Sequence, residues 1–455
     1  MESFINSEYI RNLIKETENA SYDDIEKVLD KASLKKGLSH QDVAILLNIK
    51  EEKQLERLHQ ISFDLKKTIY GDRVVLFAPL YLSNYCVNNC EYCGFKRDNN
   101  LDRYRLTLDE VTKEVKALEK IGHKRLAIEF GEDPINNNID YVTDVIKTIY
   151  AAGDIRRVNV NIAATTVEEY KKLKDAEIGT YILFQETYDK DKYKELHGTD
   201  SLKSDYDRQL YAHHRAIEAG IDDVGGGVLF GLANDYRFDL IALMIHDEEL
   251  LDKFGVEFHT ISFPRIKPAE GVNLSKYNTI DDETFMKIVS IVRVAKPLVG
   301  MIVSTREDHD MRMRLINQGI SQISANSSTS VGGYEEDNHG KEQFELGDNL
   351  TLLETIKDLI KHGNLPSYCT ACYRMGRTGK EFHDQVESLK IAQMCHPNAI
   401  LTSLEYAIDS KDKELYDLAY PFLIEQIEKI KDEQIKDKVK GYFKRIENGE
   451  RDLYI

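Results

Sequence analysis

The chain has no tryptophan, only six cysteines in 455 residues, and no apolar run of the length that a membrane span requires. A spanning helix needs about 20 consecutive apolar residues, so we expect no membrane segment. Basic residues are also fewer than acidic ones: the chain has 61 Lys and Arg and 79 Asp and Glu, which gives a formal net charge of -18. This balance argues against nucleic acid and anionic membrane surfaces as partners. The first residues carry no basic segment followed by an apolar one, which predicts no secretory signal and a cytoplasmic protein.

The few cysteines fall into two triads, with none left over. They are Cys86, Cys90 and Cys93 in the pattern Cys-x3-Cys-x2-Cys, and Cys369, Cys372 and Cys395 further along. Three thiolates can hold a four-iron cubane and leave one iron open to a ligand that is not protein. A structural zinc site is the alternative, but it takes four ligands and the first triad has no fourth candidate nearby. The spacing predicts two open [4Fe–4S]-type clusters, whose sensitivity to oxygen favours an anaerobic cytoplasm.

Short apolar runs rich in β-forming residues alternate with amphipathic segments beyond residue 70. The runs are Val74–Leu80, Arg125–Phe130, Arg157–Ala163, Thr180–Gln185, Asp223–Gly231, Val256–Ser262, Val299–Thr305 and Gln322–Ser328. Eight such alternations predict an α/β fold, a (β/α)8 TIM barrel, although six would also be compatible with a partial barrel. Helical periodicity before and after the runs predicts a helical N-terminal extension and a helical C-terminal domain. The predicted domains are residues 1–70, 71–340 and 341–455, with the second triad in the last.

In such a barrel the active-site residues lie on loops at the carboxyl ends of the strands. The first triad begins six residues after Leu80. Other polar residues at or near strand ends are Glu132, Gln185, Glu186, His259 and Arg306. Strand ends are often polar in any protein, so it is the set that predicts a site, not any single residue.

The first triad resembles that of the radical S-adenosylmethionine (SAM) superfamily. The resemblance implies that SAM chelates the open iron through its amino and carboxylate groups and is cleaved to a 5′-deoxyadenosyl radical. Tyr92 matches the aromatic position near the adenine, and Gly131-Glu132 resembles the glycine–acid motif that receives the methionyl amino group. Gln185 and Glu186 are placed for the ribose or methionyl end. Arg208 resembles the arginine that holds the carboxylate, although an exposed helix arginine is an equally good interpretation.

The sequence around the second triad points to one family within this superfamily. The runs 368–382 and 394–399, with segments such as 159–166, 181–188 and 303–307, are similar to the HydG family of tyrosine lyases that mature [FeFe]-hydrogenase. The resemblance implies cleavage of L-tyrosine to p-cresol and dehydroglycine. It further implies that the second [4Fe–4S]-type cluster converts dehydroglycine to carbon monoxide and cyanide on a labile fifth iron. A free cysteine thiolate would bridge that iron, and other hydrogenase maturation proteins would receive the product.

The same resemblance gives His259 as the ligand of the labile iron, although a lone histidine at a strand end is more often structural. Ser304, Thr305 and Arg306 are candidates for holding the tyrosine carboxylate. Arg265 is a further candidate that would serve equally well as a salt-bridge partner on the barrel rim. The chain departs from the family's pattern at Leu350 and His383, neither of which is a predicted cluster ligand.

Two other functions compete with this one. A tyrosine lyase of the thiazole pathway would share the barrel and the substrate but stop at dehydroglycine, and the second triad with His259 argues against it. A non-enzymatic iron–sulfur scaffold or redox sensor would have closed clusters and no SAM site, and Tyr92 and Gly131-Glu132 argue against that.

Overall fold

The computed structural model describes residues 3–335, 341–375 and 390–455. Residues 376–382 of the C-terminal signature, and His383, lie outside the described residues.

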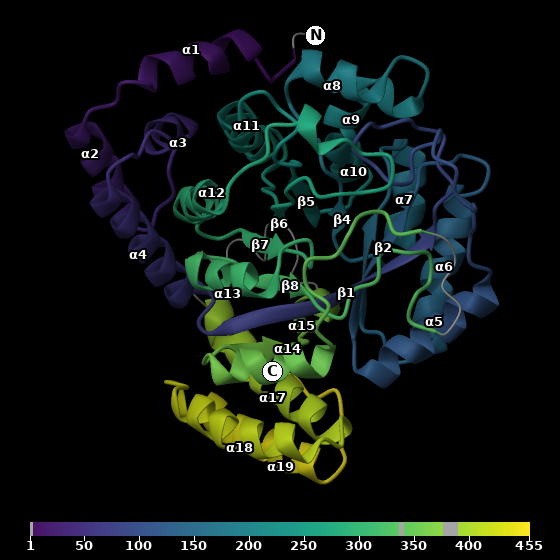
Figure 1. Ribbon diagram of the computed structural model, residues 1–455. Coiled ribbons are helices and arrows are strands. Elements are labelled where there is room, and N and C mark those ends of the chain that lie inside the picture. Colours follow the sequence, from purple (N-terminus) through teal and green to yellow (C-terminus); the bar gives the residue numbers. More distant parts are fainter. Residues whose placement is uncertain (1–2, 336–340, 376–389) are drawn as a thin grey trace.

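Eight parallel strands form a closed barrel (Figure 1). They are β1 (Arg73–Ser83), β2 (Arg125–Phe130), β3 (Arg157–Asn161), β4 (Tyr181–Ile182), β5 (Val224–Gly227), β6 (Thr260–Ser262), β7 (Gly300–Val303) and β8 (Gln322–Ser324). β1 pairs with β2 through its carboxyl half and with β8 through its amino half, which closes the sheet. The prediction of a (β/α)8 barrel is confirmed, and the partial barrel is excluded.

Most strands are shorter than their predicted runs. The run Thr180–Gln185, for example, contains the two-residue β4, while Leu183 beyond it still donates to Gly225 O at 3.0 Å. Leu183 and Phe184 also line a cavity at the carboxyl ends of the strands. Apolar sequence alone does not show where a strand ends and the lining of a cavity begins.

A ninth strand, β9 (Leu365–Ser367), lies within the predicted C-terminal domain. It pairs in parallel with the start of β1, from Arg73↔Leu365 to Val75↔Ser367. Three residues that include a proline give no strand signal, and proline is tolerated here because β9 is the last strand in the sheet order. The expectation that the second triad belongs to an appendage apart from the barrel wall therefore needs correction, because Cys369 follows a strand of the same sheet.

Helices surround the barrel (Figure 1). They are α5 (Leu108–Ile121), α6 (Ile139–Ala152), α7 (Val167–Asp175), α8 (Lys190–His197), α9 (Tyr206–Leu210), α10 (Ala212–Glu218), α11 (Tyr236–Phe254), α12 (Asp282–Ala295) and α13 (His309–Gln318), with 3₁₀ turns η1 (Leu202–Ser204) and η2 (Leu274–Lys276). α5 shows why these segments are helical. A capping box of Thr107 and Glu110 starts it, and Gly122, at φ 111°, ends it.

The N-terminal extension consists of α1 (Ser7–Thr17), α2 (Tyr22–Ser33), α3 (His40–Leu46) and α4 (Glu52–Ile69). Ser21 begins α2 and Ser39 begins α3, each with a capping box. α3 packs on α11, and α4 packs on α12 and α13, so the extension covers one side of the barrel (Figure 1).

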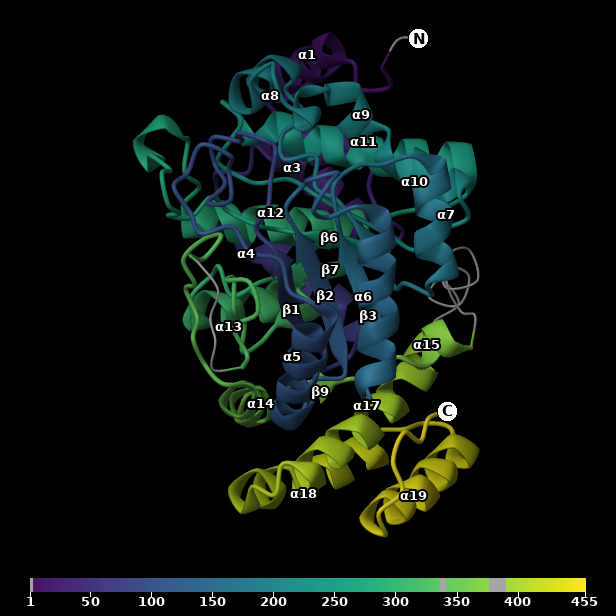
Figure 2. The ribbon, with the colours of Figure 1, turned by 90° about the vertical axis from the view of Figure 1, so that its right-hand side faces the viewer.

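The C-terminal region contains α14 (Leu352–Lys361), α15 (Ala371–Arg374), α17 (Lys390–Asp409), α18 (Lys413–Glu428) and α19 (Glu433–Glu447), gathered at one end of the barrel (Figure 2). The predicted helix 403–409 is the end of the longer α17. α19 forms where the sequence suggested only a charged tail, because its spaced apolar residues Val439, Phe443 and Ile446 are buried. None of the helices in the described ranges combines the length and apolarity needed to cross a membrane.

Candidate functional site

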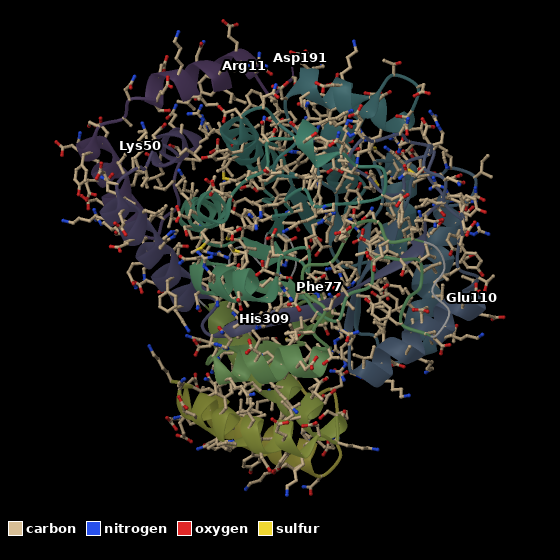
Figure 3. All side chains as sticks on the ribbon, viewed as in Figure 1. Arg11, Lys50, Phe77, Glu110, Asp191 and His309 are labelled. Carbon is tan, nitrogen blue, oxygen red and sulfur yellow. The ribbon has the colours of Figure 1, made fainter. Side chains whose placement is uncertain are left out.

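A cavity of ≈ 240 Å³ lies at the carboxyl ends of the strands, and Phe77 of β1 is among the side chains inside the barrel (Figure 3). Loops after β1, β2, β4 and β7 bring ten of the predicted residues to it. These are Cys86, Cys90, Cys93, Tyr92, Gly131, Glu132, Glu186, Ser304, Thr305 and Arg306. Residues about 220 positions apart in the chain thus share one enclosed space, as expected for the active-site end of a barrel.

The cysteines of the first triad are free thiols that face this cavity from one loop. Burial raises the pKa of Cys93 to about 11, so its thiol is protonated until iron displaces the proton. Among the described residues, no three His, Cys, Asp or Glu side chains are close enough to hold a single metal ion. A cubane is several ångströms wide and needs its thiolates further apart than one zinc ion does. The donor set and its spread therefore fit a [4Fe–4S] cluster better than zinc.

Gly131 allows the loop after β2 to pack against the cysteine loop. A Cβ at this position would lie 2.3 Å from the carbonyl oxygen of Tyr85 and 3.1 Å from the Cβ of Cys86. Next to it, the carbonyl of Glu132 accepts a hydrogen bond from Val87 N at 2.8 Å. The Glu132 side chain accepts another from Asn88 Nδ2 at 2.5 Å. The two loops therefore form one rigid unit.

Charged pairs line the side of the cavity where SAM is expected. Arg208 lies 2.7 Å from Glu132 and also donates to the carbonyl of Ala164, although Arg208 does not itself line the cavity. Glu186, at φ 69°, pairs with Lys203 at 2.7 Å. Burial opposes the charge on Lys203, but Glu186 and Cys90 outweigh it and raise its pKa. Lys203 was not predicted, because only its ion pair with Glu186, which the sequence does not show, indicates that it belongs to the site.

The wall formed by β7 carries Ser304, Thr305 and Arg306. The Arg306 guanidinium lies 3.4 Å from the centre of the Phe344 ring, a cation–π contact that holds it in the cavity. Opposite stands Glu129 of β2, which also lines the cavity and was not predicted. Burial raises the pKa of Glu129 to about 8, while Arg306 and Asn161 oppose this. The available signal was a glutamate inside the apolar run of residues 126–130.

Besides Arg208, two further residues predicted for this site do not line the cavity. Gln185 is buried, and its main-chain nitrogen donates to Gly227 O at 3.0 Å. Arg265 donates through Nε to Glu307 at 3.0 Å, through Nη2 to the other oxygen of Glu307, and through Nη1 to Asp282 at 2.9 Å. These contacts favour the salt-bridge interpretation of Arg265.

The second triad lies toward the opposite end of the barrel. Cys369 follows β9, and Cys395 is in α17, which packs on β9. Burial and then the nearby Cys395 raise the pKa of Cys369 to about 11, so the two thiols are neighbours. Cys372 and Cys395 both pack, half-buried, against the hydrophobic core.

We expected His259 at the carboxyl end of its strand. It lies instead at the amino end, the same end of the barrel as the second triad. β6 begins at Thr260, and His259 directly precedes it, where its N donates to Val224 O at 2.8 Å and its carbonyl accepts from Gly300 N at 2.9 Å. Burial lowers the pKa of His259, and Arg125 lowers it further. Arg125 also acts on Cys369. A shared neighbour therefore places the histidine and the second triad at one end of the barrel.

Comparisons with known proteins agree with this arrangement. Residues 80–244 match the family model of the radical SAM superfamily, and residues 262–364 match that of the Biotin and Thiamin Synthesis associated domain. The 2-iminoacetate synthase of Salmonella typhimurium is 30% identical over 71% of this chain and 84% of its own length.

Two solved structures match along almost the whole chain. One is the crystal structure of HydG, a maturase of the [FeFe]-hydrogenase, which is 49% identical with a TM-score of 0.97 and full coverage of both chains. HydG from Carboxydothermus hydrogenoformans is 38% identical, with a TM-score of 0.86 over 96% of this chain and 97% of that one. With its closed barrel and two cysteine triads, the chain belongs to the HydG family of the radical SAM superfamily.

Proposed function

We propose that this protein is a radical SAM tyrosine lyase that supplies carbon monoxide and cyanide for the active site of an [FeFe]-hydrogenase. L-Tyrosine is cleaved to p-cresol and dehydroglycine at the first site, and dehydroglycine is converted at the second. The observation that carries the proposal is the presence of two cysteine triads toward opposite ends of one closed barrel. One barrel thereby offers two separate sites to one substrate.

At the first site, Cys86, Cys90 and Cys93 hold a [4Fe–4S] cluster with SAM. When bound, this group supplies a 5′-deoxyadenosyl radical by one-electron cleavage of SAM. Glu132, which pairs with Arg208, receives the ammonium group of SAM. The Glu186–Lys203 pair sets the charge on the adjoining wall.

Tyrosine occupies the remainder of the cavity. Arg306, with Ser304 and Thr305 beside it, binds the carboxylate of the substrate, because a guanidinium makes paired hydrogen bonds to a carboxylate. Aromatic side chains that line the same cavity, Phe184 and Phe263, exclude water from the reacting atoms. A dry cavity protects a reactive intermediate from side reactions.

At the second site, Cys369, Cys372 and Cys395 hold the second cluster, and His259 binds the iron that leaves as part of the product. Imidazole is a suitable ligand for ferrous iron. A free cysteine thiolate joins this iron to the cluster. The support in this chain is that Arg125 lies near both Cys369 and His259.

A second candidate function is that of the 2-iminoacetate synthases, with release of dehydroglycine as the product. The 30% identity to the Salmonella typhimurium protein favours it. The second triad and His259 have no purpose in such a reaction, and this places it behind the two-site function.

One anaerobic experiment separates the candidates. Reconstituted protein is incubated with SAM, dithionite and L-tyrosine, and p-cresol and carbon monoxide are measured together. Both products are expected. p-Cresol without carbon monoxide would assign the protein to the dehydroglycine-releasing lyases, and the absence of both would refute tyrosine as the substrate.

A further inference from the structure

Asp223 and His259 stand next to each other where two neighbouring strands begin. Asp223 immediately precedes β5, and His259 immediately precedes β6. His259 N donates to Val224 O at 2.8 Å, and Tyr181 N donates to Asp223 O at 3.0 Å. Both main chains are therefore fixed by the hydrogen bonds of the sheet, and the two Cα positions cannot move apart without breaking it.

The Asp223 carboxylate is buried but lacks hydrogen bonds. The residue is 2% exposed, and neither carboxylate oxygen accepts a hydrogen bond from any described residue. A buried carboxylate without hydrogen bonds is costly, so proteins seldom keep one that has no task. Asp223 forms an ion pair with His259, whose Nδ1 is 3.9 Å from Oδ2. A small rotation of either side chain would turn this contact into a hydrogen bond.

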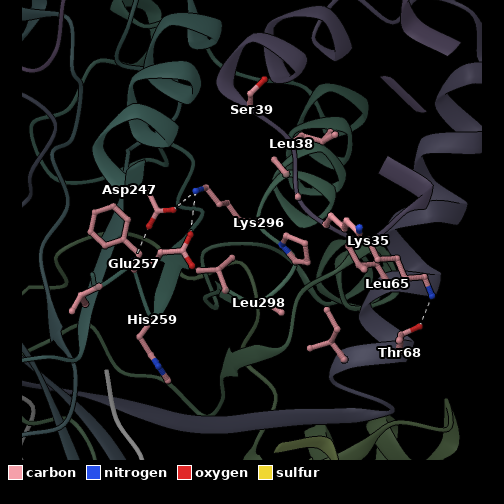
Figure 4. Close-up of a pocket in the computed structure, with 18 of the residues that line it drawn as sticks. Lys35, Leu38, Ser39, Leu65, Thr68, Asp247, Glu257, His259, Lys296 and Leu298 are labelled. Carbon is pink, nitrogen blue, oxygen red and sulfur yellow. Dashed lines mark hydrogen bonds and ion pairs between the residues drawn. The ribbon is translucent and has the colours of Figure 1, made fainter. Parts of the chain in front are cut away.

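His259 also lines a pocket of ≈ 850 Å³ between the N-terminal extension and the barrel, whereas Asp223 does not (Figure 4). Two acids of this pocket already have a partner, because Lys296 lies 2.7 Å from Asp247 and 3.3 Å from Glu257. Asp223 is therefore the acid placed beside Nδ1 of His259 from within the barrel.

We propose that Asp223 is a positioning residue that accepts a hydrogen bond from Nδ1–H of His259 and leaves Nε2 as the iron-binding nitrogen. This inference rests on the proposed role of His259. Histidines that bind metals commonly donate their second ring N–H to a carboxylate, which fixes the tautomer, orients the ring and makes it a stronger ligand. Asp223 is placed for this task by the register of β5 and β6.

The test is a ferrous-iron titration of the anaerobically reconstituted full-length protein in the presence of L-cysteine, with a competing ferrous chelator. Asp223→Asn keeps the side-chain shape and removes the charge, and it should weaken iron binding by about 10- to 100-fold. Asp222→Asn is the matched control, because it removes the same charge from the adjacent, exposed residue, which lines the pocket beside His259, and it should weaken iron binding less than Asp223→Asn does. Asp223→Glu, which retains a carboxylate, should recover part of the affinity. Cluster content and thermal midpoint are measured on every variant.

Unchanged iron affinity in Asp223→Asn would overturn the proposal. A His259→Ala arm separates this outcome from failure of the function itself. If His259→Ala loses the iron and Asp223→Asn does not, the positioning role is wrong and the iron site stands. If His259→Ala also binds iron as the wild type does, the proposed role of His259 fails, and that of Asp223 fails with it. Equal weakening by Asp222→Asn and Asp223→Asn would reduce the effect to general charge and also refute the proposal.

Discussion

Arg208 Nη2 lies 2.7 Å from Glu132 Oε1, although 76 positions separate the two residues in the sequence. Glu132 uses its other oxygen to accept from Asn88, in the loop of the first cysteine triad. Arg208 also donates to the carbonyl of Ala164, beyond β3. One chain of hydrogen bonds therefore joins the cysteine loop, the loop after β2 and α9. The residues expected to bind SAM set one another's positions before any ligand arrives.

Replacement of Arg208 by lysine should weaken SAM binding by about 10-fold or more, since a hydrogen bond to a charged group contributes about 1.5–3 kcal/mol. Lysine keeps the charge but does not reproduce the guanidinium geometry. Anaerobic equilibrium binding of SAM to the reconstituted protein measures the effect. Arg11→Lys is the control, because its pair with Asp189 is at the surface and 3.3 Å long. Equal affinity in both variants would remove Arg208 from the SAM site.

Variants of the two cysteine triads should affect the two half-reactions separately. Cys395→Ala should abolish carbon monoxide while p-cresol is still formed, because the first cavity does not include the second triad. Cys90→Ala should abolish both products, since the second step depends on the first. p-Cresol is measured by chromatography and carbon monoxide by its binding to a reduced haem protein. If Cys395→Ala lost both products, the proposed division of labour between the clusters would be wrong.

The barrel could be predicted because enclosed strands are apolar and its helices begin with capping residues. β2 has the predicted bounds, Arg125–Phe130. The run Asp223–Gly231 was predicted too long, because β5 ends at Gly227 and the buried Val228 and Phe230 form only isolated bridges beyond it. β9 could not be predicted, since its pairing with β1 depends on a contact almost 300 positions away.

The cysteines of the candidate site could be predicted because their spacing is local. Lys203 and Asp223 could not, because each is marked only by a partner that is distant in the sequence. Asp223 stands out once the fold brings it beside His259. Arg265 is the opposite case, a residue predicted for the site that has a structural partner instead. Its sequence neighbourhood, Pro264-Arg265, does not show that it forms an ion pair with Glu307.

Arg265 should be required for stability and not for substrate binding. The side chains of Arg265 and Glu307 are 9% and 1% exposed, so Arg265→Met leaves a buried carboxylate without its main partner. Breaking such a pair costs about 3–5 kcal/mol. Lys267 lies 3.4 Å from Glu307 and compensates in part for the loss of Arg265, so the loss of stability should be near the lower end of this range. Urea unfolding measures the loss, and Arg451→Met, at a more exposed pair with Asp409, serves as the control. A weaker affinity for tyrosine at unchanged stability would instead make Arg265 a substrate-binding residue.

Glu129 should make the stability of the ligand-free protein depend on pH. Burial raises its pKa from 4.5 to about 8, so the folded protein keeps the proton that the unfolded chain releases above pH 4.5. The contribution of Glu129 is therefore complete below pH 4.5, falls as the pH rises to about 8, and is constant above that. Glu129→Gln mimics the protonated acid and does not titrate. The stability of the wild type relative to this variant should fall between pH 5 and 8, by at most about 1.4 kcal/mol per pH unit, and then level off. Thermal midpoints of both proteins across this range measure the difference. A constant difference would show that Glu129 ionises in the cavity as it does in water, and that Arg306 fully compensates for its burial.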